Sequence, residues 1–456
     1  MSMAADPTEA LAAFVANLRL DDVPAPVRER AADLLLDAVV CALAADHAED
    51  LAPFGSMVDA IDPAHGDATV LGSHERRSAA AAVLLNGFRI TAVTACDVYA
   101  PAEMHSTPAV VPPALALAER DGASGADLLR AVVVGLETAT RIARSFDRPT
   151  YRERGWHSPG IIGPFGGAAA GAAILGLPAE IVRNALAIAG SQAAGTWAQR
   201  GTPTVKFHQA RAAHAGLMSA LLAASEFGGA SRVFTAPEGG LYTAIAAGDP
   251  ELATAALGEH WELMEISVRL FPGGARVQPA VAAAIAALGG SALDPDSVSA
   301  VEVRVAPDIA RAQAWAASPT STFAALASIH FGVALTLHDG AAAPAGFTAE
   351  RYGDPSLQAF MAERLTVVPD DDVPTLGARV RITTADGRIL DGAVDRPRGD
   401  PRTPATRDEL ATKAHRFGDE RLGSAVIDEL VERMRSIDRE PDVRPLLAIV
   451  RGAPDS

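Results

Sequence analysis

An aspartate and a histidine lie eight residues apart in a segment that the sequence predicts to be a loop between two helices. The segment runs from Cys96 to His105, and its acid–base pair is Asp97 and His105. Carboxylate and imidazole are the usual pair where a proton must be taken from carbon or oxygen near neutral pH. The alternative is that Asp97 caps a helix and His105 faces solvent, and the local sequence favours neither interpretation.

A second histidine, His157, lies in a loop rich in glycine and proline that runs from Gly155 to Gly160. A helix of small residues follows, and its free N–H groups could face an anion. The loop is not a dinucleotide-binding fingerprint, because no strand precedes it and the glycine spacing is wrong. Without other information, a histidine in such a loop is more often structural than catalytic.

Four potential cations lie within twelve residues at the start of a long alanine-rich helix. They are Arg200, Lys206, His208 and Arg211. Such a cluster suits the capture of a carboxylate or a phosphate. The alternative is a solvated helix start, although cations in a first turn oppose the helix dipole and so lack a reason in stability.

Other chemistries are disfavoured by what the sequence contains. Cys41 and Cys96 are too few for a disulfide framework and indicate free thiols in a reducing compartment. The neighbouring Asp97 raises the thiol pKa of Cys96, which argues against a nucleophile there. No cysteine–histidine spacing resembles a zinc site, and no serine lies in a Gly-x-Ser-x-Gly motif.

Composition and charge narrow the possible partners. Among 456 residues, 39 are Lys or Arg and 56 are Asp or Glu, so the formal charge is −17. That charge disfavours nucleic acid and anionic membranes as partners. The N-terminus lacks the basic and apolar regions of a secretory signal, and the apolar stretch at 161–177 contains Pro164 and many glycines. These features predict a cytoplasmic protein.

The periodicity of apolar residues predicts which elements carry these side chains. Helical spacing dominates the first 260 residues, whereas period-two alternation appears at 301–305, 365–368 and 378–383, with a hairpin turn at 385–387. Helical stretches lie between these strands at 277–288 and 322–337, and helix resumes from Arg407. The predicted fold is mostly α with an α+β part. It has a large all-α domain (1–267), a smaller α+β lid domain (268–400) and a C-terminal helical return to the first domain (401–456).

With these segments in order, the chain resembles the MmgE/PrpD family, which includes 2-methylcitrate dehydratase, cis-aconitate decarboxylase and iminodisuccinate epimerase. The likeness spans nearly the whole length, and its strength lies in about a dozen short motifs in the right order. They include Leu35-Leu36-Asp37, Asn86-Gly87, the Asp97 to His105 loop, Gly155-Trp156-His157, Gly163-Pro164-Phe165-Gly166, Lys206 to Ala213, Phe271-Pro272 and Pro397 to Pro401.

The resemblance implies chemistry next to a carboxylate of a small anionic metabolite, in a homodimer and with neither a cofactor nor a metal. The hard step is removal of a proton from carbon, which needs a positioned base and cations where charge develops. His105 and His157 would serve as acid and base. Asp97 would orient one imidazole and favour its protonated form. Lys206 completes the expected catalytic set.

The chain departs from the family pattern within this set. Tyr99 and Ala100 replace the later acidic residues of the family's Asp-Phe-Asp-Asp-Thr stretch. Without a gap, Val205 takes the position of the family's active-site lysine, and Lys206 is its neighbour.

Further departures from the family pattern concern the α+β part, and they affect the residues expected to contact the substrate. Gly274 and Gln313 stand where the decarboxylase branch has a histidine and a tyrosine, so cis-aconitate decarboxylation itself is not expected. Arg269 keeps the charge of the family's Lys-x-Tyr-Pro motif. The residues expected to contact the substrate are Tyr99, Trp156, His208, Arg211, Arg269 and Gln313.

The sequence therefore predicts a cofactor-independent lyase, of the hydro-lyase type, that acts on a small anionic metabolite. An isomerase, an epimerase or a pathway-specific cyclase would use the same two histidines. A catalytically inactive binding or scaffold protein is a third alternative, favoured by the lost family residues and opposed by the intact Asp97, His105 and His157. The substrate itself is not predicted.

Overall fold

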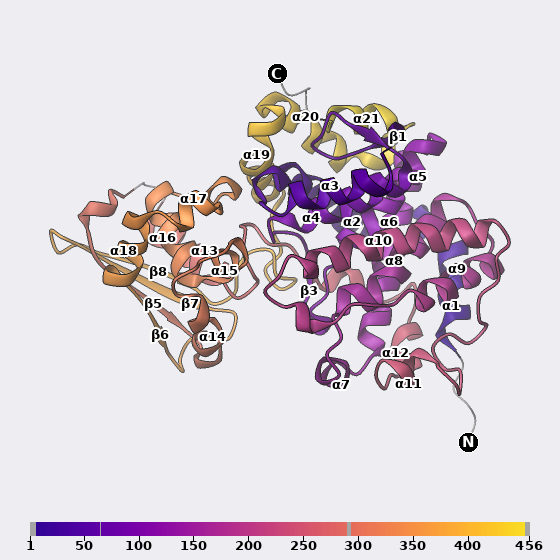
Figure 1. Ribbon diagram of the computed structural model, residues 1–456, viewed down its shortest axis with the longest axis horizontal. Helices are drawn as coiled ribbons and strands as arrows, with labels where there is room; N and C mark the ends of the chain where they lie inside the picture. The colour runs from indigo at the N-terminus through magenta and orange to yellow at the C-terminus, as the bar shows by residue number, and fades with distance from the viewer. Residues whose placement is uncertain (1–5, 64, 290–292, 452–456) are drawn as a thin grey trace.

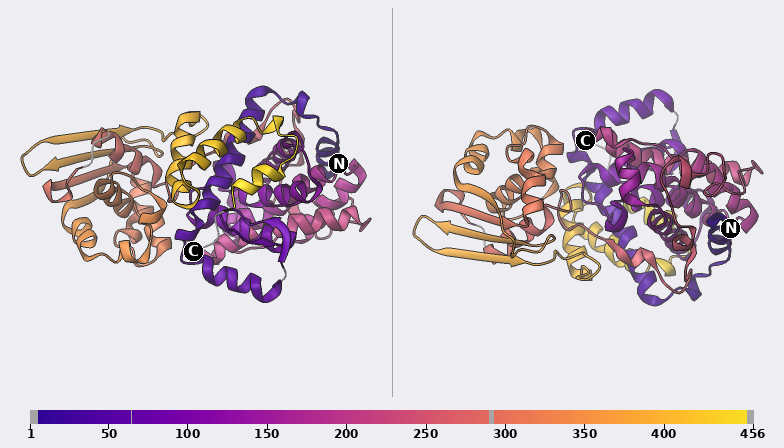
Figure 2. Two further views of the ribbon diagram at one scale, coloured as in Figure 1. Left: turned by 90° about the horizontal axis from the view of Figure 1, so that it is seen from above. Right: turned by 90° about the horizontal axis from the view of Figure 1, so that it is seen from below.

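The chain forms two lobes, a large helical lobe and a smaller α+β lobe, which lie side by side (Figures 1 and 2). A computed structural model describes residues 6–63, 65–289 and 293–451. The two lobes have separate hydrophobic cores. This arrangement confirms the predicted fold class of a mostly α protein with an α+β part.

The helical lobe is built around α8 (Ser158–Ile174), which is buried along almost its whole length. A helix that is apolar all round must be covered on every side, and α8 packs against four of its neighbours, α5, α6, α9 and α10. Glycines let the backbones approach closely. A Cβ atom on Gly216 of α10 would lie 2.6 Å from the Cα atom of Gly167, so a side chain there would force α8 and α10 apart.

Twelve α-helices and four short strands of the described residues belong to the N-terminal part of this lobe. The helices are α1 (Pro7–Asn17), α2 (Ala25–Leu43), α3 (Leu51–Ile61), α4 (Ala79–Ala92), α5 (Thr107–Asp121), α6 (Gly125–Ser145), α7 (Arg148–Glu153), α8 (Ser158–Ile174), α9 (Ala179–Ser191), α10 (Thr204–Ala224), α11 (Leu241–Ala244) and α12 (Pro250–Thr254). The strands are β1 (His65–Thr69), β2 (Arg76–Arg77), β3 (Val98–Tyr99) and β4 (Ile266–Ser267), paired antiparallel as β1–β2 and β3–β4.

The α+β lobe holds a four-stranded sheet in the order β6-β5-β7-β8, in which β5 and β6 are parallel and the other pairs are antiparallel. Alternate residues of β5, such as Val301 and Val303, are buried. Helix α13 packs against β7 and β8, and α16 packs against α13. The elements are α13 (Gln278–Leu288), β5 (Val298–Val305), α14 (Pro307–Gln313), α15 (Thr322–Ala327), α16 (Ile329–Asp339), α17 (Ala349–Tyr352), α18 (Pro355–Arg364), β6 (Leu365–Pro369), β7 (Ala378–Thr384) and β8 (Ile389–Val394).

One element differs from its prediction. The helix predicted at 322–337 is divided at Ser328, whose extended backbone (φ −92°, ψ 118°) separates α15 from α16. The Ser328 side chain accepts a hydrogen bond from the backbone N–H of Phe331 and so caps α16. Serine favours such caps over helix interiors because its hydroxyl competes for backbone groups.

The C-terminal helices pack on the helical lobe, where they appear in yellow in Figure 1. They are α19 (Arg407–Leu422), α20 (Ser424–Arg435) and α21 (Arg444–Ile449). Their apolar residues, among them Leu410 and Phe417, join the core of that lobe. A buried ion pair between Lys413 of α19 and Asp37 of α2 fastens them, and the Lys413 ammonium also donates to the carbonyl of Ala95 at 2.9 Å.

Across the described residues, none of the helices combines the length and the hydropathy needed to cross a lipid bilayer.

The buried ion pair predicts a large stability effect. Removal of one partner leaves a buried charge uncompensated, so Lys413→Met should lower the free energy of unfolding by about 3–5 kcal/mol, measured by urea denaturation. Arg388→Met is the matched control, because Arg388 and Asp386 form an exposed pair and such pairs contribute less than about 1 kcal/mol. Equal changes in the two variants would contradict this role of Lys413.

Candidate active site

A cavity of about 350 Å³ lies at the junction of the two lobes. The helical lobe contributes His105, His157, Lys206 and Arg269 to its wall, and the α+β lobe contributes Gln313. These five residues come from segments that are far apart in the sequence. The structure therefore brings half of the ten predicted site residues to one cavity.

Asp97 is wholly buried and does not line the cavity. Its carboxylate accepts hydrogen bonds from the backbone N–H groups of Ser106 (2.7 Å) and Thr107 (3.0 Å) and from the Thr107 hydroxyl (2.5 Å). These groups stand at the start of α5, where N–H groups have no partner within the helix. Asp97 thus caps a helix, as the alternative interpretation had it, but His105 faces the cavity rather than open solvent.

The backbone of Asp97 determines the orientation of His105. The imidazole Nδ1 lies 2.6 Å from the Asp97 carbonyl oxygen. Because a carbonyl oxygen only accepts, Nδ1 carries the proton and Nε2 holds a free lone pair in the neutral ring. The His105 imidazole is therefore presented to the cavity as a base.

The charge state of His105 depends on more than Asp97, which was expected to favour the protonated form. Burial, and then the nearby guanidinium of Arg269, lower the pKa of His105 to about 4, and the opposing effect of Asp97 is smaller. The effect of Asp97 has the expected sign, but burial and Arg269 outweigh it. At neutral pH the ring is uncharged, which is the state that a general base needs.

His157 occupies the residue that precedes α8, and its Nδ1 lies 3.0 Å from Nδ1 of His208. Burial, and then the possible positive charges of His208 and His105, hold the pKa of His157 well below its usual range. Two facing nitrogens share one proton between neutral rings, so one imidazole donates and the other accepts. His208 does not line the cavity. His208 instead lies against His157, and its predicted contact with the substrate stays a prediction.

Two buried cations complete the wall. The Lys206 ammonium lies 3.5 Å from Asp50, and burial lowers the pKa of Lys206 despite that carboxylate. The Arg269 guanidinium donates to the carbonyls of Cys96 (2.7 Å) and Gly273 (3.3 Å). Among the described residues, no carboxylate oxygen lies within 4 Å of Arg269. A buried cation whose partners are neutral favours an anion in the adjoining space.

Val205 also lines the cavity, next to Lys206. Val205, at the position of the family's lysine, and its neighbour Lys206 therefore both line this cavity. Burial raises the pKa of the Cys96 thiol to about 11, so that side chain is not a thiolate near neutral pH.

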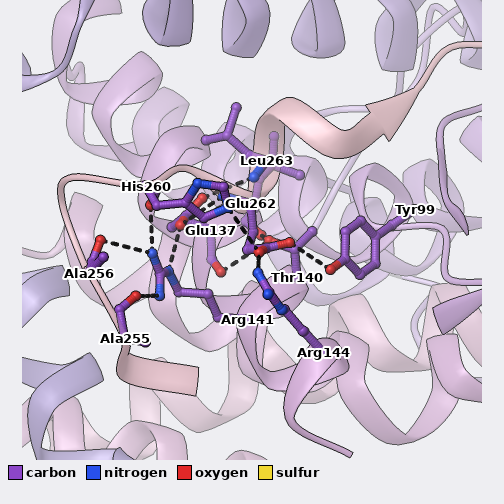
Figure 3. Close-up of polar contacts among 11 residues, drawn as sticks. Tyr99, Glu137, Thr140, Arg141, Arg144, Ala255, Ala256, His260, Glu262 and Leu263 are labelled. Atoms are coloured by element: carbon purple, nitrogen blue, oxygen red, sulfur yellow. Dashed lines mark hydrogen bonds and ion pairs between the residues drawn. The ribbon is translucent and has the colours of Figure 1, made fainter. Parts of the chain in front are cut away.

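Three other predicted contact residues lie outside the cavity wall. Tyr99 is wholly buried, and its hydroxyl donates to Glu262 at 2.8 Å (Figure 3). Arg211 donates to the carbonyls of Gln192, Gly160 and Ala194, which ties the loop after α9 to the start of α8. Trp156 is half-buried against the core of the helical lobe. Each of these three side chains is held by contacts within the protein.

Tyr99, in the loop that leads to His105, belongs to a network of polar contacts with Glu262, Arg144 and Glu137 (Figure 3). Glu262 also pairs with Arg144 of α6 and with His260. Glu137 of α6 accepts from the backbone N–H groups of Glu262 (3.1 Å) and Leu263 (3.0 Å). The segment before Arg269 and the loop before His105 are thus fixed to the same helix.

Several cavity residues were missed by the sequence analysis. The Arg152 guanidinium lies 3.7 Å from the ring centroid of Trp197, and it pairs with Glu103 at 3.4 Å. Gln209 is 3% exposed, and its Oε1 atom has no hydrogen-bond partner among the described residues. The signal for Gln209 was its place in the Lys206 to Ala213 motif, one helical turn after Lys206.

Among the described residues, no three histidine, cysteine or carboxylate side chains converge as a metal site requires.

Comparison with known proteins assigns the class of protein. The model of the MmgE/PrpD N-terminal domain matches residues 9–253, and that of the C-terminal domain matches residues 271–436. The chain belongs to the MmgE/PrpD family.

Curated relatives match along almost their whole length. A cis-aconitate decarboxylase-like protein, oryM, of Aspergillus oryzae is 29% identical over 98% of this chain and 97% of its own. The cis-aconitate decarboxylase of Aspergillus terreus is 26% identical over 97% and 95%, and that of Homo sapiens is 25% identical over 98% and 94%. Decarboxylases are lyases, and these matches support an enzyme of the lyase class.

The contact between the two imidazoles predicts a measurable effect. His208→Leu keeps His157 buried but removes a group whose positive charge would oppose protonation of His157. The pKa of His157 should therefore rise, and because burial remains it should stay below its ordinary value. NMR titration of the imidazole signals measures this. His214→Leu, on the same helix and outside the cavity wall, is the control, and an unchanged His157 pKa in His208→Leu would contradict the proposed coupling.

Proposed function

We propose that this protein is a hydro-lyase that eliminates water from a small hydroxycarboxylate, without a cofactor. The observation that carries the proposal is the neutral His105 imidazole, whose tautomer leaves Nε2 free, in one cavity with the buried cations Lys206 and Arg269. Base, acid and anion-binding groups are all present in the chain. The cytoplasmic location and the homodimer that the resemblance implies remain part of the proposal.

The chemical step is a β-elimination. Arg269 binds the substrate carboxylate, and His105 Nε2 takes the proton from the carbon next to it. The electron pair of that C–H bond forms the new carbon–carbon double bond while the C–O bond at the next carbon breaks. The departing hydroxide receives a proton from Lys206 and leaves as water.

Electrostatics supports these roles. Negative charge develops on the carboxylate as the proton leaves, and a guanidinium already desolvated in the wall stabilises it without reorganisation. Burial lowers the pKa of Lys206, so its ammonium is a stronger acid than that of an ordinary lysine. His157, held by His208, lines the same space as His105 and Lys206.

Decarboxylation is the second candidate, and the names of the relatives favour it. It would break a carbon–carbon bond, release CO₂ and return a proton to the carbanion from Lys206 or His157. Gly274 and Gln313, which line the cavity where the decarboxylase branch is expected to have histidine and tyrosine, favour elimination of water instead.

An NMR assay in D₂O separates these reactions. The protein is incubated with a panel of di- and tricarboxylates that includes 2-methylcitrate and cis-aconitate. We expect loss or addition of water, and we expect His105→Gln to lower the rate by about 10²–10⁴-fold. His74→Gln, an exposed histidine outside the cavity, should retain full activity.

The other outcomes are distinct. Release of CO₂ would replace the hydro-lyase by a decarboxylase, and C–H exchange or inversion without loss of water would indicate an isomerase. Activity unchanged in both His105→Gln and His157→Gln would overturn the site. No reaction with the entire panel would contradict a hydro-lyase of simple carboxylates.

A further inference from the structure

The two lobes contribute different chemistry to the cavity. Its histidines and its buried cations come from the helical lobe, whereas the α+β lobe contributes Phe323, Ala327 and Ala275 beside the polar Gln313 and the exposed Arg276. Beside them, Gly274 leaves space, since a Cβ atom there would have its nearest neighbour at 4.0 Å. A substrate held by its carboxylate on the helical side thus faces Phe323 and two alanines, which form the apolar part of the opposite wall.

The apolar part of this wall continues from the cavity to the surface through Phe323. The Phe323 ring stacks on Trp315, with ring centroids 6.1 Å apart and planes inclined by 24°. Trp315 follows the cavity residue Gln313 by two positions and is 51% exposed. Few large apolar side chains of the described residues are as exposed, and the Trp315 ring is in contact with a residue of the cavity wall.

Phe323 also meets the opposite lobe. Its ring edge lies 4.0 Å from where a Cβ atom on Gly201 would stand, in the loop that carries Arg200 and Trp197. Phe323 and Trp315 therefore form an apolar strip along the junction of the lobes, with one end at the cavity. A polar metabolite confined to the cationic side would leave this strip uncovered.

We propose that the substrate is a carboxylate that carries an unbranched apolar arm, and that the arm packs along Phe323 toward Trp315. The inference rests on the proposed function for the position of the carboxylate, and it adds the class of substituent. Continuity with the cavity is the argument for a substrate arm over a separate partner, because the same phenyl ring lines the cavity and stacks on the exposed indole.

The expected effect follows from burial of apolar surface. Each methylene group that leaves water contributes about 0.8 kcal/mol, which is about a fourfold gain in affinity per methylene. The gain should continue along the chain until the arm passes Trp315. Cations alone would bind every homologue with equal affinity.

Binding of succinate and of 2-methyl-, 2-butyl- and 2-hexylsuccinate, measured by isothermal titration calorimetry, tests the proposal. For the unaltered protein we expect affinity to rise by about fourfold per methylene group. Phe323→Ala and the surface variant Trp315→Ala should lose most of that gain while retaining the affinity for succinate. Ile389→Ala removes an equally exposed side chain on β8 and should behave as the unaltered protein.

The outcomes separate the two proposals. Succinate binding that is lost in Arg269→Gln, together with affinities that do not depend on chain length, would overturn the apolar arm and leave the proposed function standing. A chain-length effect that persists in both Phe323→Ala and Trp315→Ala would also overturn the arm site. Failure of every acid to bind, succinate included, would overturn the proposed function and the arm with it.

Discussion

The geometry of the cavity depends on one buried carboxylate. Asp97 has no access to water, so its charge must be satisfied by hydrogen bonds within the protein. It takes them from Ser106 and Thr107 at the start of α5, which closes the intervening loop on itself. The same closure places the carbonyl of Asp97 against His105. Asp97 does not line the cavity, but it thereby determines which imidazole nitrogen of His105 faces the substrate.

Electrostatics explains how an acidic protein can hold an anion. The formal charge is −17, yet the cavity wall combines two buried cations with imidazoles that burial keeps neutral. Arg269 has two effects, because it offers its charge to a carboxylate and lowers the pKa of His105. The arrangement that attracts the substrate thus also maintains the base in its active form.

Periodicity predicted the helical lobe and the strands of the α+β lobe, because those patterns reflect burial that is local in sequence. The direction of single side chains was harder to predict. In the two-residue strand β3, Val98 lines the cavity and Tyr99 turns to Glu262, since successive side chains of a strand point to opposite faces. The sequence predicted a loop there, so this alternation was not foreseen. The contact between His208 and His157 was not foreseen for a related reason, because it joins residues 51 positions apart.

The central claim is that the fold presents His105 as a neutral base with its lone pair on Nε2. The most direct measurement is a ¹⁵N NMR titration of the His105 imidazole in the full-length protein. We predict a protonated Nδ1 and an unprotonated Nε2 at neutral pH, with the ring becoming charged only near pH 4. A proton on Nε2 at neutral pH, in either the other neutral tautomer or the imidazolium, would contradict the account.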